Sequence, residues 1–182
     1  MLEIELKAKV RDHALVESRL SSFMTYGGPI DKRDEYWSIP LAIPSATGPG
    51  FRFRLRCEPG SDTVTFKEKT YTSTVEINKE TEFGVADAAA FRAFLAKMSA
   101  RLLYRKSKRG GVWRAADGII AELVTVEGLG EYLEVETLCE ENPSVDVNSV
   151  RKRLIAVIDR CGLLASDIEP RPYSQLLGVP GY

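Results

Sequence analysis

Apolar and charged residues alternate over residues 2–10 of the chain. The apolar set is Leu2, Ile4, Leu6, Ala8 and Val10, and the charged set is Glu3, Glu5, Lys7 and Lys9. A period of two predicts a β-strand with one apolar face and one charged face. The same alternation predicts strands at 51–57 and 63–69, joined by a turn at 58–62, and a further strand at 75–83.

Helical spacing follows an aspartate at three places, and each aspartate is expected to be an N-cap. The three are Asp12, Asp87 and Asp146; the first helix should end before Gly27-Gly28 and the third at Gly162. Further strands are predicted around Tyr36-Trp37 and at 103–109, 112–115, 119–126 and 131–137. Residues 40–50 contain three prolines and two glycines, which predicts a loop.

The predicted elements include more strands than helices, and short turns join neighbouring strands. This arrangement favours an α+β fold with a mainly antiparallel sheet. No long linker separates two cores, so residues 1–182 are expected to form a single domain.

Composition excludes several classes of function. The chain has 25 basic and 26 acidic residues and a net charge of −1, which argues against a nucleic-acid or membrane partner. Three separated cysteines and a single histidine make a zinc site or a disulfide framework improbable. The first residues do not resemble a signal peptide, and no apolar stretch approaches 18 residues, so a cytoplasmic location is expected.

The charges are nevertheless sorted by sign along the strands. Basic rows lie at Arg52/Arg54/Arg56 and Lys67/Lys69, and acidic rows at Glu80/Glu82 and Glu134/Glu136. A solvated sheet face would explain any one of these strands. Like charges on neighbouring strands repel, however, so segregated rows indicate a bound ion or a highly charged ligand.

A closed barrel of about eight strands would turn these rows inward around a small ligand. Basic rows would then bind phosphate oxygens, and carboxylate rows would hold a hard divalent cation. The chain has neither GxxxxGK[ST] nor GxGxxG. The pattern therefore predicts a polyphosphate site that uses Mg²⁺ or Mn²⁺ and lacks a P-loop.

Several motifs, in order over nearly the whole chain, resemble the CYTH superfamily of triphosphate tunnel metalloenzymes. They are the ExExK motif at 3–7, the RxR strand at 54–56, TxK at 65–67, the paired glutamates at 80–82 and VEGLGEYLEVE at 126–136. The terminal EPRPYSQLL at 169–177 is similar to the ending of the class IV adenylyl cyclases, one branch of that superfamily.

This resemblance implies an α+β fold with a closed antiparallel eight-stranded β-barrel, or tunnel, and flanking helices. It implies a divalent ion, Mg²⁺ or Mn²⁺, on Glu3, Glu5, Glu134 and Glu136. The implied phosphate-binding residues, with Arg52 and Lys69 added from the basic rows, are Lys7, Arg52, Arg54, Arg56, Lys67, Lys69, Lys106, Lys108, Arg109 and Arg171. Of these, Lys7, Arg54, Arg56 and Lys67 are the expected catalytic residues, and Glu80, Glu82 and Glu122 are expected to line the tunnel.

The chain departs from the family pattern at two places. Val124 stands where members often carry aspartate, with Glu122 one pleat away on the same face, and the His-Phe pair of the cyclase branch has no counterpart ahead of Glu3. The first expectation is a class IV adenylyl cyclase-like enzyme that converts ATP to cyclic AMP and pyrophosphate, with a homodimer implied by the same branch. The alternatives are a triphosphatase acting on thiamine triphosphate or inorganic triphosphate, and a non-catalytic protein that binds a triphosphate or cyclic nucleotide.

Overall fold

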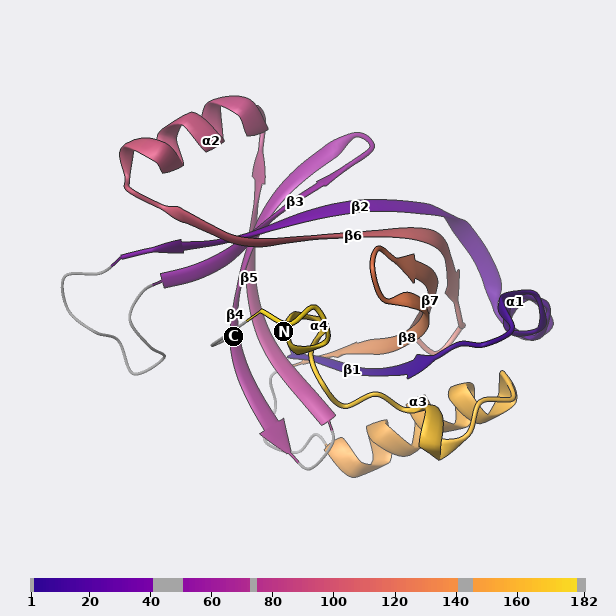
Figure 1. Cartoon of the computed structure of the whole chain (residues 1–182). Coiled ribbons are helices and arrows are strands. Elements are labelled where there is room, and N and C mark those ends of the chain that lie inside the picture. Colours follow the sequence, from indigo (N-terminus) through magenta and orange to yellow (C-terminus); the bar gives the residue numbers. More distant parts are fainter. Residues whose placement is uncertain (1, 41–50, 73–74, 141–145, 180–182) are drawn as a thin grey trace. The chain divides into compact units, whose positions relative to one another are not determined.

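A computed structural model describes residues 2–40, 51–72, 75–140 and 146–179, and between 67 and 79 it describes the backbone alone. Strands and helices follow one another along the chain as Figure 1 shows. They are β1 (Leu2–Lys9), α1 (His13–Ser21), β2 (Thr25–Ile39), β3 (Phe51–Glu58), β4 (Ser61–Thr72), β5 (Val75–Val85), α2 (Ala88–Lys97), β6 (Arg101–Arg114), β7 (Ile119–Val126), β8 (Gly130–Cys139), α3 (Val147–Arg160), a 3₁₀ turn (Ala165–Asp167) and α4 (Tyr173–Leu176).

The strand order is that of an eight-stranded barrel. Hydrogen-bonded neighbours follow the order β1-β5-β4-β3-β2-β6-β7-β8, and β8 pairs with β1. The pairings of β1 with β5 and β8, of β3 with β2 and β4, and of β7 with β6 and β8 are antiparallel. The predicted α+β fold with an eight-stranded antiparallel barrel-like sheet and flanking helices is confirmed.

The chain divides into two compact units, each assembled from separate segments. The first contains Met1–Ile30, Glu68–Lys79 and Lys108–Tyr182, and the second contains Asp31–Lys67 and Glu80–Ser107. Four strands, β2, β4, β5 and β6, contribute residues to both units. A single domain over 1–182 stays a prediction.

In the first unit, α1 and α3 cover the apolar face of β1, β7 and β8. The buried residues of this core include Ile4, Leu6, Ala8, Leu20, Leu123, Leu133, Val135, Leu154 and Ile158. Figure 1 shows α3 beside β1 and β8. Since side chains alternate between the two faces of a strand, the charged residues of β1 and β8 lie on the face opposite these helices.

In the second unit, α2 belongs to a smaller core. Phe53, Leu55, Val64, Ala88 and Leu95 form its buried centre. Burial of a large aliphatic or aromatic side chain contributes roughly 1.5–3 kcal/mol. The alternation of β3 then places its arginines on the opposite face from this core.

The three predicted N-caps are present. The side chain of Asp12 accepts a hydrogen bond from the backbone of Leu15, that of Asp87 from Ala89 and Ala90, and that of Asp146 from Asn148. Part of the predicted loop, residues 41–50, lies outside the described residues. The 3₁₀ turn and α4 are not predicted by the sequence pattern.

Two strands are longer than their glycines suggest. β2 begins at Thr25 and passes through Gly27 and Gly28, where a helix end is expected from the sequence. β6 runs through Gly110 and Gly111, where two separate strands are expected. A Cβ on Gly110 would overlap the carbonyl oxygen of Leu123 on β7. The glycine therefore marks a close approach of two backbones inside the sheet and not a break in the strand.

Among the described residues, no helix is both long and apolar enough to cross a membrane.

Candidate active site

Three carboxylates of the first unit come together on the charged face of β1 and β8. Oxygens of Glu3, Glu5 and Glu136 lie within 4.8 Å of one another, and all three residues are half-buried. Glu3 and Glu5 share a face of β1, and Glu5 is directly opposite Glu136 in the antiparallel register. We call these residues the carboxylate trio. Its spacing and donor type fit a hard divalent cation.

The electrostatics of the trio also fit a cation. Burial raises the pKa of Glu136 to about 8, and the neighbouring charges of Glu3, Glu5 and Glu122 contribute to this rise against an opposing effect of Lys108. The negative charges of Glu3 and Glu5 thus oppose the ionisation of Glu136. A bound divalent ion would supply a positive charge that offsets them.

The metal-free protein is expected to lose stability as the pH rises from about 5 to 8. Folded Glu136 keeps its proton up to about pH 8, whereas an unfolded glutamate releases it at about pH 4.3. Because the folded state binds more protons between these values, the free energy of unfolding falls with rising pH, by an amount on the order of a few kcal/mol. Urea unfolding at several pH values in the presence of a chelator measures this slope.

Glu136→Gln removes the titrating group and should flatten the slope. Glu17→Gln, on the exposed face of α1, should leave it unchanged. An equally steep slope in Glu136→Gln would show that another group titrates.

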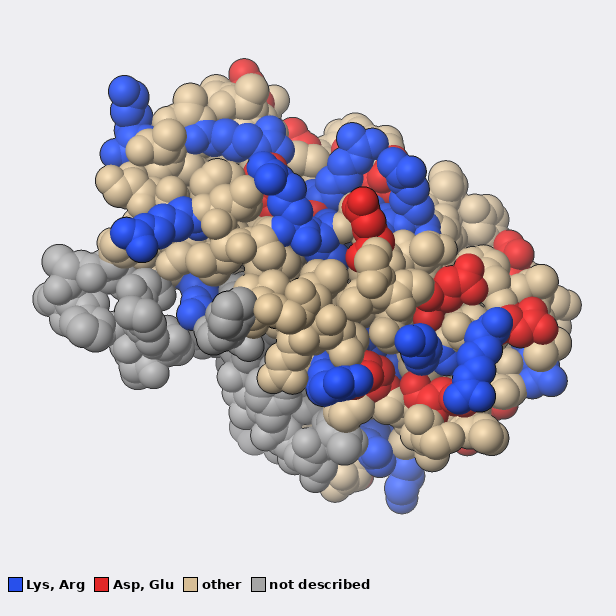
Figure 2. Space-filling model, viewed as in Figure 1, with Lys and Arg blue, Asp and Glu red and all other residues tan. Residues whose placement is uncertain are grey.

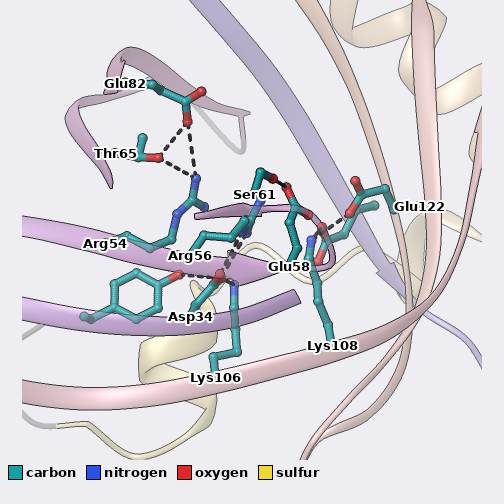
Figure 3. Close-up of polar contacts among 12 residues, drawn as sticks. Asp34, Arg54, Arg56, Glu58, Ser61, Thr65, Glu82, Lys106, Lys108 and Glu122 are labelled. Atoms are coloured by element: carbon teal, nitrogen blue, oxygen red, sulfur yellow. Dashed lines mark hydrogen bonds and ion pairs between the residues drawn. The ribbon is translucent and has the colours of Figure 1, made fainter. Parts of the chain in front are cut away.

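A second group in the first unit surrounds Lys108. Its ammonium contacts the carboxylates of Glu122, at 2.8 Å, and Glu134, and all three side chains are at least nine-tenths buried. Figure 3 shows Lys108 reaching Glu122. Glu122 on β7 is directly opposite Glu134 on β8. We call these three residues the Lys108 network.

The C-terminal helix α4 adds a tyrosine to this network. The hydroxyl of Tyr173 donates a hydrogen bond to Glu134 at 2.7 Å, and the ammonium of Lys7 lies 5.2 Å from the centre of its ring. Burial, followed by the charge of Glu134 and the hydrogen bond to it, raises the pKa of Tyr173 far above the usual range. The tyrosine therefore stays neutral and acts as a donor.

Tyr173→Phe is expected to destabilise the protein by roughly 1–3 kcal/mol, because it removes a hydrogen bond to a buried charged group. The ring, and with it the contact to Lys7, is retained. Urea unfolding measures the change. Tyr26→Phe is the matched control, since Tyr26 is 54% exposed and should tolerate the loss of its hydroxyl. A Tyr173→Phe protein as stable as this control would contradict the assigned hydrogen bond.

The second unit holds a cluster of cations around a buried aspartate. Arg56 donates two hydrogen bonds to Asp34, at 2.7 and 2.9 Å, and the ammonium of Lys106 lies 3.3 Å from the same carboxylate. Figure 3 shows Arg56 and Lys106 converging on Asp34. Burial alone would raise the pKa of Asp34, but Lys106 and then Arg56 lower it by more, and it lies well below its usual value. The carboxylate of this Asp34 cluster is therefore ionised at neutral pH.

Arg54 has a separate set of partners on the same face of β3. It donates a hydrogen bond to the hydroxyl of Thr65 at 3.0 Å, and that hydroxyl donates to Glu82 at 2.6 Å. Glu82 lies 3.7 Å from the guanidinium, whose side chain is 12% exposed. Figure 3 shows these three side chains together. Arg54 and Arg56 thus lie on the same face of β3 but are held by different residues.

The opposite face of the second unit carries other arginines. Arg92 and Arg105 both contact Glu35, at 2.9 and 3.3 Å, and Arg33 contacts Asp31 at 3.4 Å. On the face drawn in Figure 2, Lys and Arg side chains gather over α2 and the β3–β4 hairpin. Asp34 and Glu35 are neighbours on β2 and so point to opposite faces. These contacts are consequently separate from the Asp34 cluster.

The remaining predicted site residues differ from one another in exposure and in contacts. Arg52 is half-buried on the strand of Arg54, and Glu80 is half-buried on β5. Arg109 is exposed on β6, where it alternates with Lys108. Arg171 is 62% exposed and is bound by Glu169 through two side-chain hydrogen bonds of 2.9 and 2.7 Å. The side chains of Lys67 and Lys69 lie outside those described.

Glu134 and Glu136 are both predicted to bind the metal ion, but their surroundings differ. Glu136 belongs to the carboxylate trio, and Glu134 holds Lys108 and Tyr173. Val124, at the position of the family aspartate, is fully buried with Ile30, Val126 and Tyr132. The nearby Glu122 belongs to the Lys108 network.

Two residues of these clusters are not among those predicted from the sequence. Asp34 lies two residues before Tyr36 in a strand that is longer than expected, so its alternation with Tyr36 is the available signal. Tyr173 belongs to the terminal motif at 169–177, but nothing in the local pattern indicates that α4 reaches the charged face of β8.

The antiparallel barrel-like sheet thus carries a carboxylate trio in the first unit and largely buried cations in the second unit. The chain belongs to the CYTH domain family, whose model matches residues 1–173. This is the family of triphosphate tunnel proteins that the motifs indicated, and its members include adenylyl cyclases and triphosphatases. A search of curated proteins found no match.

Solved structures share the fold at low sequence identity. The PH1012 protein of Pyrococcus horikoshii has a TM-score of 0.77 and 24% identity, over 96% of this chain and 98% of that one. A candidate adenylate cyclase of Vibrio parahaemolyticus has a TM-score of 0.77 and 16% identity, over 98% of both chains. HpAC1 of Hippeastrum, a candidate adenylyl cyclase reported to have a dominant triphosphatase activity, has a TM-score of 0.61 and 17% identity, over 97% of this chain and 93% of that one.

Proposed function

We propose that the protein is a divalent-metal-dependent enzyme that acts on a triphosphate, with the class IV adenylyl cyclase reaction as the first candidate. The observation that carries this proposal is the carboxylate trio of Glu3, Glu5 and Glu136, whose raised pKa at Glu136 favours a bound cation. Family membership over residues 1–173 supports the triphosphate as the substrate class. Mg²⁺ and Mn²⁺ are the proposed ions, since both are hard cations that bind carboxylate oxygens.

The trio would hold the ion, and the cations would bind the phosphates. A bound divalent ion would polarise a phosphoryl oxygen and lower the pKa of a coordinated hydroxyl or water. Arg54, Arg56 and Lys106 are the proposed phosphate-binding residues, because guanidinium and ammonium groups form charge-assisted hydrogen bonds with phosphate oxygens. By resemblance, Lys7 and Lys67 are further proposed catalytic residues. The contact of Lys108 with Glu134 would fix the position of that carboxylate.

The bond changes of the cyclase reaction need no covalent enzyme intermediate. The 3′-hydroxyl of ATP attacks the α-phosphorus, the bond from that phosphorus to the bridging oxygen breaks, and pyrophosphate leaves. The protein's contribution is to position the triphosphate and to stabilise the charge that develops on its oxygens.

Hydrolysis of a triphosphate is the second candidate. Water would attack the terminal phosphorus, and phosphate would leave. Val124 favours this candidate, because an apolar side chain packed with Ile30 and Val126 replaces the aspartate that many family members carry there. Glu122 is bound to Lys108, which limits its use as a replacement.

Product analysis separates the candidates. The protein is incubated with ATP, thiamine triphosphate or inorganic triphosphate, each with Mg²⁺ or Mn²⁺. Cyclic AMP and pyrophosphate in equal amounts support the cyclase, and phosphate without cyclic AMP supports the triphosphatase. Tight binding without turnover would leave the non-catalytic binding protein. The predicted homodimer and cytoplasmic location stay proposals.

A further inference from the structure

A buried carboxylate lies on the same face as the cations proposed to bind phosphate. The side chain of Asp34 is fully buried, whereas those of Arg56 and Lys106, which contact it, keep 14% and 7% of their surface exposed. A fixed negative charge beside a phosphate site repels a polyanion. Asp34 therefore needs a role that outweighs this repulsion.

The register of the sheet places Asp34 opposite the arginine that it binds. Asp34 on β2 is directly opposite Arg56 on β3, and Tyr36 is directly opposite Arg54. The contact between Asp34 and Arg56 is bidentate, through Nε and Nη2 of the guanidinium. Such a contact fixes both the position and the plane of the guanidinium.

The ammonium of Lys106 also contacts an aromatic ring. The ring of Tyr36 stacks on that of Tyr104, with centroids 4.2 Å apart and planes within 6°, and the ammonium of Lys106 lies 5.7 Å from the centre of the Tyr36 ring. A cation over a tyrosine face is attracted to it. Lys106 therefore has two partners, the carboxylate of Asp34 and the ring of Tyr36.

We propose that Asp34 is a positioning residue that preorganises Arg56 and Lys106 for the oxygens of a triphosphate. This inference rests on one part of the proposed function, the triphosphate as the bound ligand. It does not require that the triphosphate is converted. The low pKa of Asp34 agrees with it, because the carboxylate stays ionised at neutral pH and keeps both cations in place. The energy lost to repulsion is offset because the contacts with Asp34 already fix Arg56 and Lys106, so less ordering is needed when the ligand binds.

The sign of one binding change tests the proposal. Asp34→Asn removes a negative charge, so electrostatics alone predicts tighter binding of inorganic triphosphate. Asparagine also offers a single oxygen and turns an N–H toward the cations, so positioning predicts weaker binding. We expect the dissociation constant to rise about 10- to 100-fold, which corresponds to the loss of one hydrogen bond to a charged group.

Isothermal titration of the full chain with inorganic triphosphate, with and without Mg²⁺, measures this change. Asp31→Asn is the matched control, because Asp31 contacts the exposed Arg33, and its dissociation constant should stay within about twofold of wild type. Circular dichroism establishes that each variant is folded. Should Asp34→Asn not fold, Asp34→Glu keeps the charge while displacing both cations, and it should weaken binding in the same direction.

Tighter or unchanged binding by the folded Asp34→Asn protein, or by Asp34→Glu in its place, overturns the positioning role. Wild-type protein that binds inorganic triphosphate without converting any triphosphate contradicts only the proposed enzyme. Wild-type protein that does not bind inorganic triphosphate overturns the positioning role, whereas the proposed enzyme is contradicted only when none of the three triphosphates is converted.

Discussion

Glu5→Gln is expected to abolish metal-dependent turnover of triphosphates, with a fall in rate of at least about 10³-fold. Glu5 is the centre of the carboxylate trio, since it shares a strand face with Glu3 and is opposite Glu136. Glutamine keeps the shape of the side chain but removes one of the charges that hold the ion. Loss of the ion removes its stabilisation of the developing charge and its effect on the attacking hydroxyl or water.

The measurement is the initial rate with saturating triphosphate over a series of Mg²⁺ and Mn²⁺ concentrations. Glu17→Gln has the same chemical change on the exposed face of α1 and should keep the wild-type rate. Full activity of Glu5→Gln at ordinary metal concentrations would contradict the assignment of the trio as the metal site. Recovery only at much higher metal concentrations would agree with it.

Arg54→Ala is expected to lower kcat/KM by about 10²–10³, or roughly 2.7–4 kcal/mol, the usual effect of removing one well-placed donor to a developing charge. Arg54 is a suitable donor because Thr65 and Glu82 fix its guanidinium while leaving further N–H groups for a ligand. Its side chain is largely buried, so the interaction with phosphate is weakly screened.

Steady-state kinetics with each triphosphate measure this effect. Arg33→Ala is the matched control, since Arg33 is 66% exposed and contacts the carboxylate of Asp31 near the surface. Its kcat/KM should stay within about twofold of wild type. Equal losses in both variants would show a general effect of positive charge and would contradict a specific role of Arg54.

Local patterns predict the faces of the strands but not their partners. The alternation along β1 is sufficient to place Glu3 and Glu5 on one face, because a period of two fixes the face of each side chain. The third member of the trio depends on the register that sets Glu5 opposite Glu136, and a strand sequence does not specify the register of a neighbour more than 100 residues away.

The glycines of β6 limit the prediction in a second way. Gly110-Gly111 suggests a break between two strands, which leaves the alignment of Lys106, Lys108 and Arg109 with the family open. The structure shows one continuous strand, in which Lys106 and Lys108 share a face and Arg109 does not. The glycines are there because neighbouring groups leave no space for a Cβ, and this is a tertiary cause that the local sequence does not contain.

Asp34 and Tyr173 show why charge rows alone are insufficient. A row is visible when like charges recur at every second position, as in β3. Asp34 lies in a stretch of mixed charge, Asp-Lys-Arg-Asp-Glu at 31–35, and its partner Arg56 is 22 residues away. Tyr173 acts from a four-residue helix whose position depends on packing against Tyr132, with the rings 5.2 Å apart.

The most direct test is the metal dependence of triphosphate consumption by the wild-type protein. ATP, thiamine triphosphate and inorganic triphosphate are each supplied with Mg²⁺ or Mn²⁺, then with excess chelator, and then with excess metal again. We predict that at least one of them is consumed with metal, that chelation stops the reaction, and that added metal restores it. Consumption that continues under chelation, or no consumption of any of the three, would contradict a metal-dependent triphosphate enzyme.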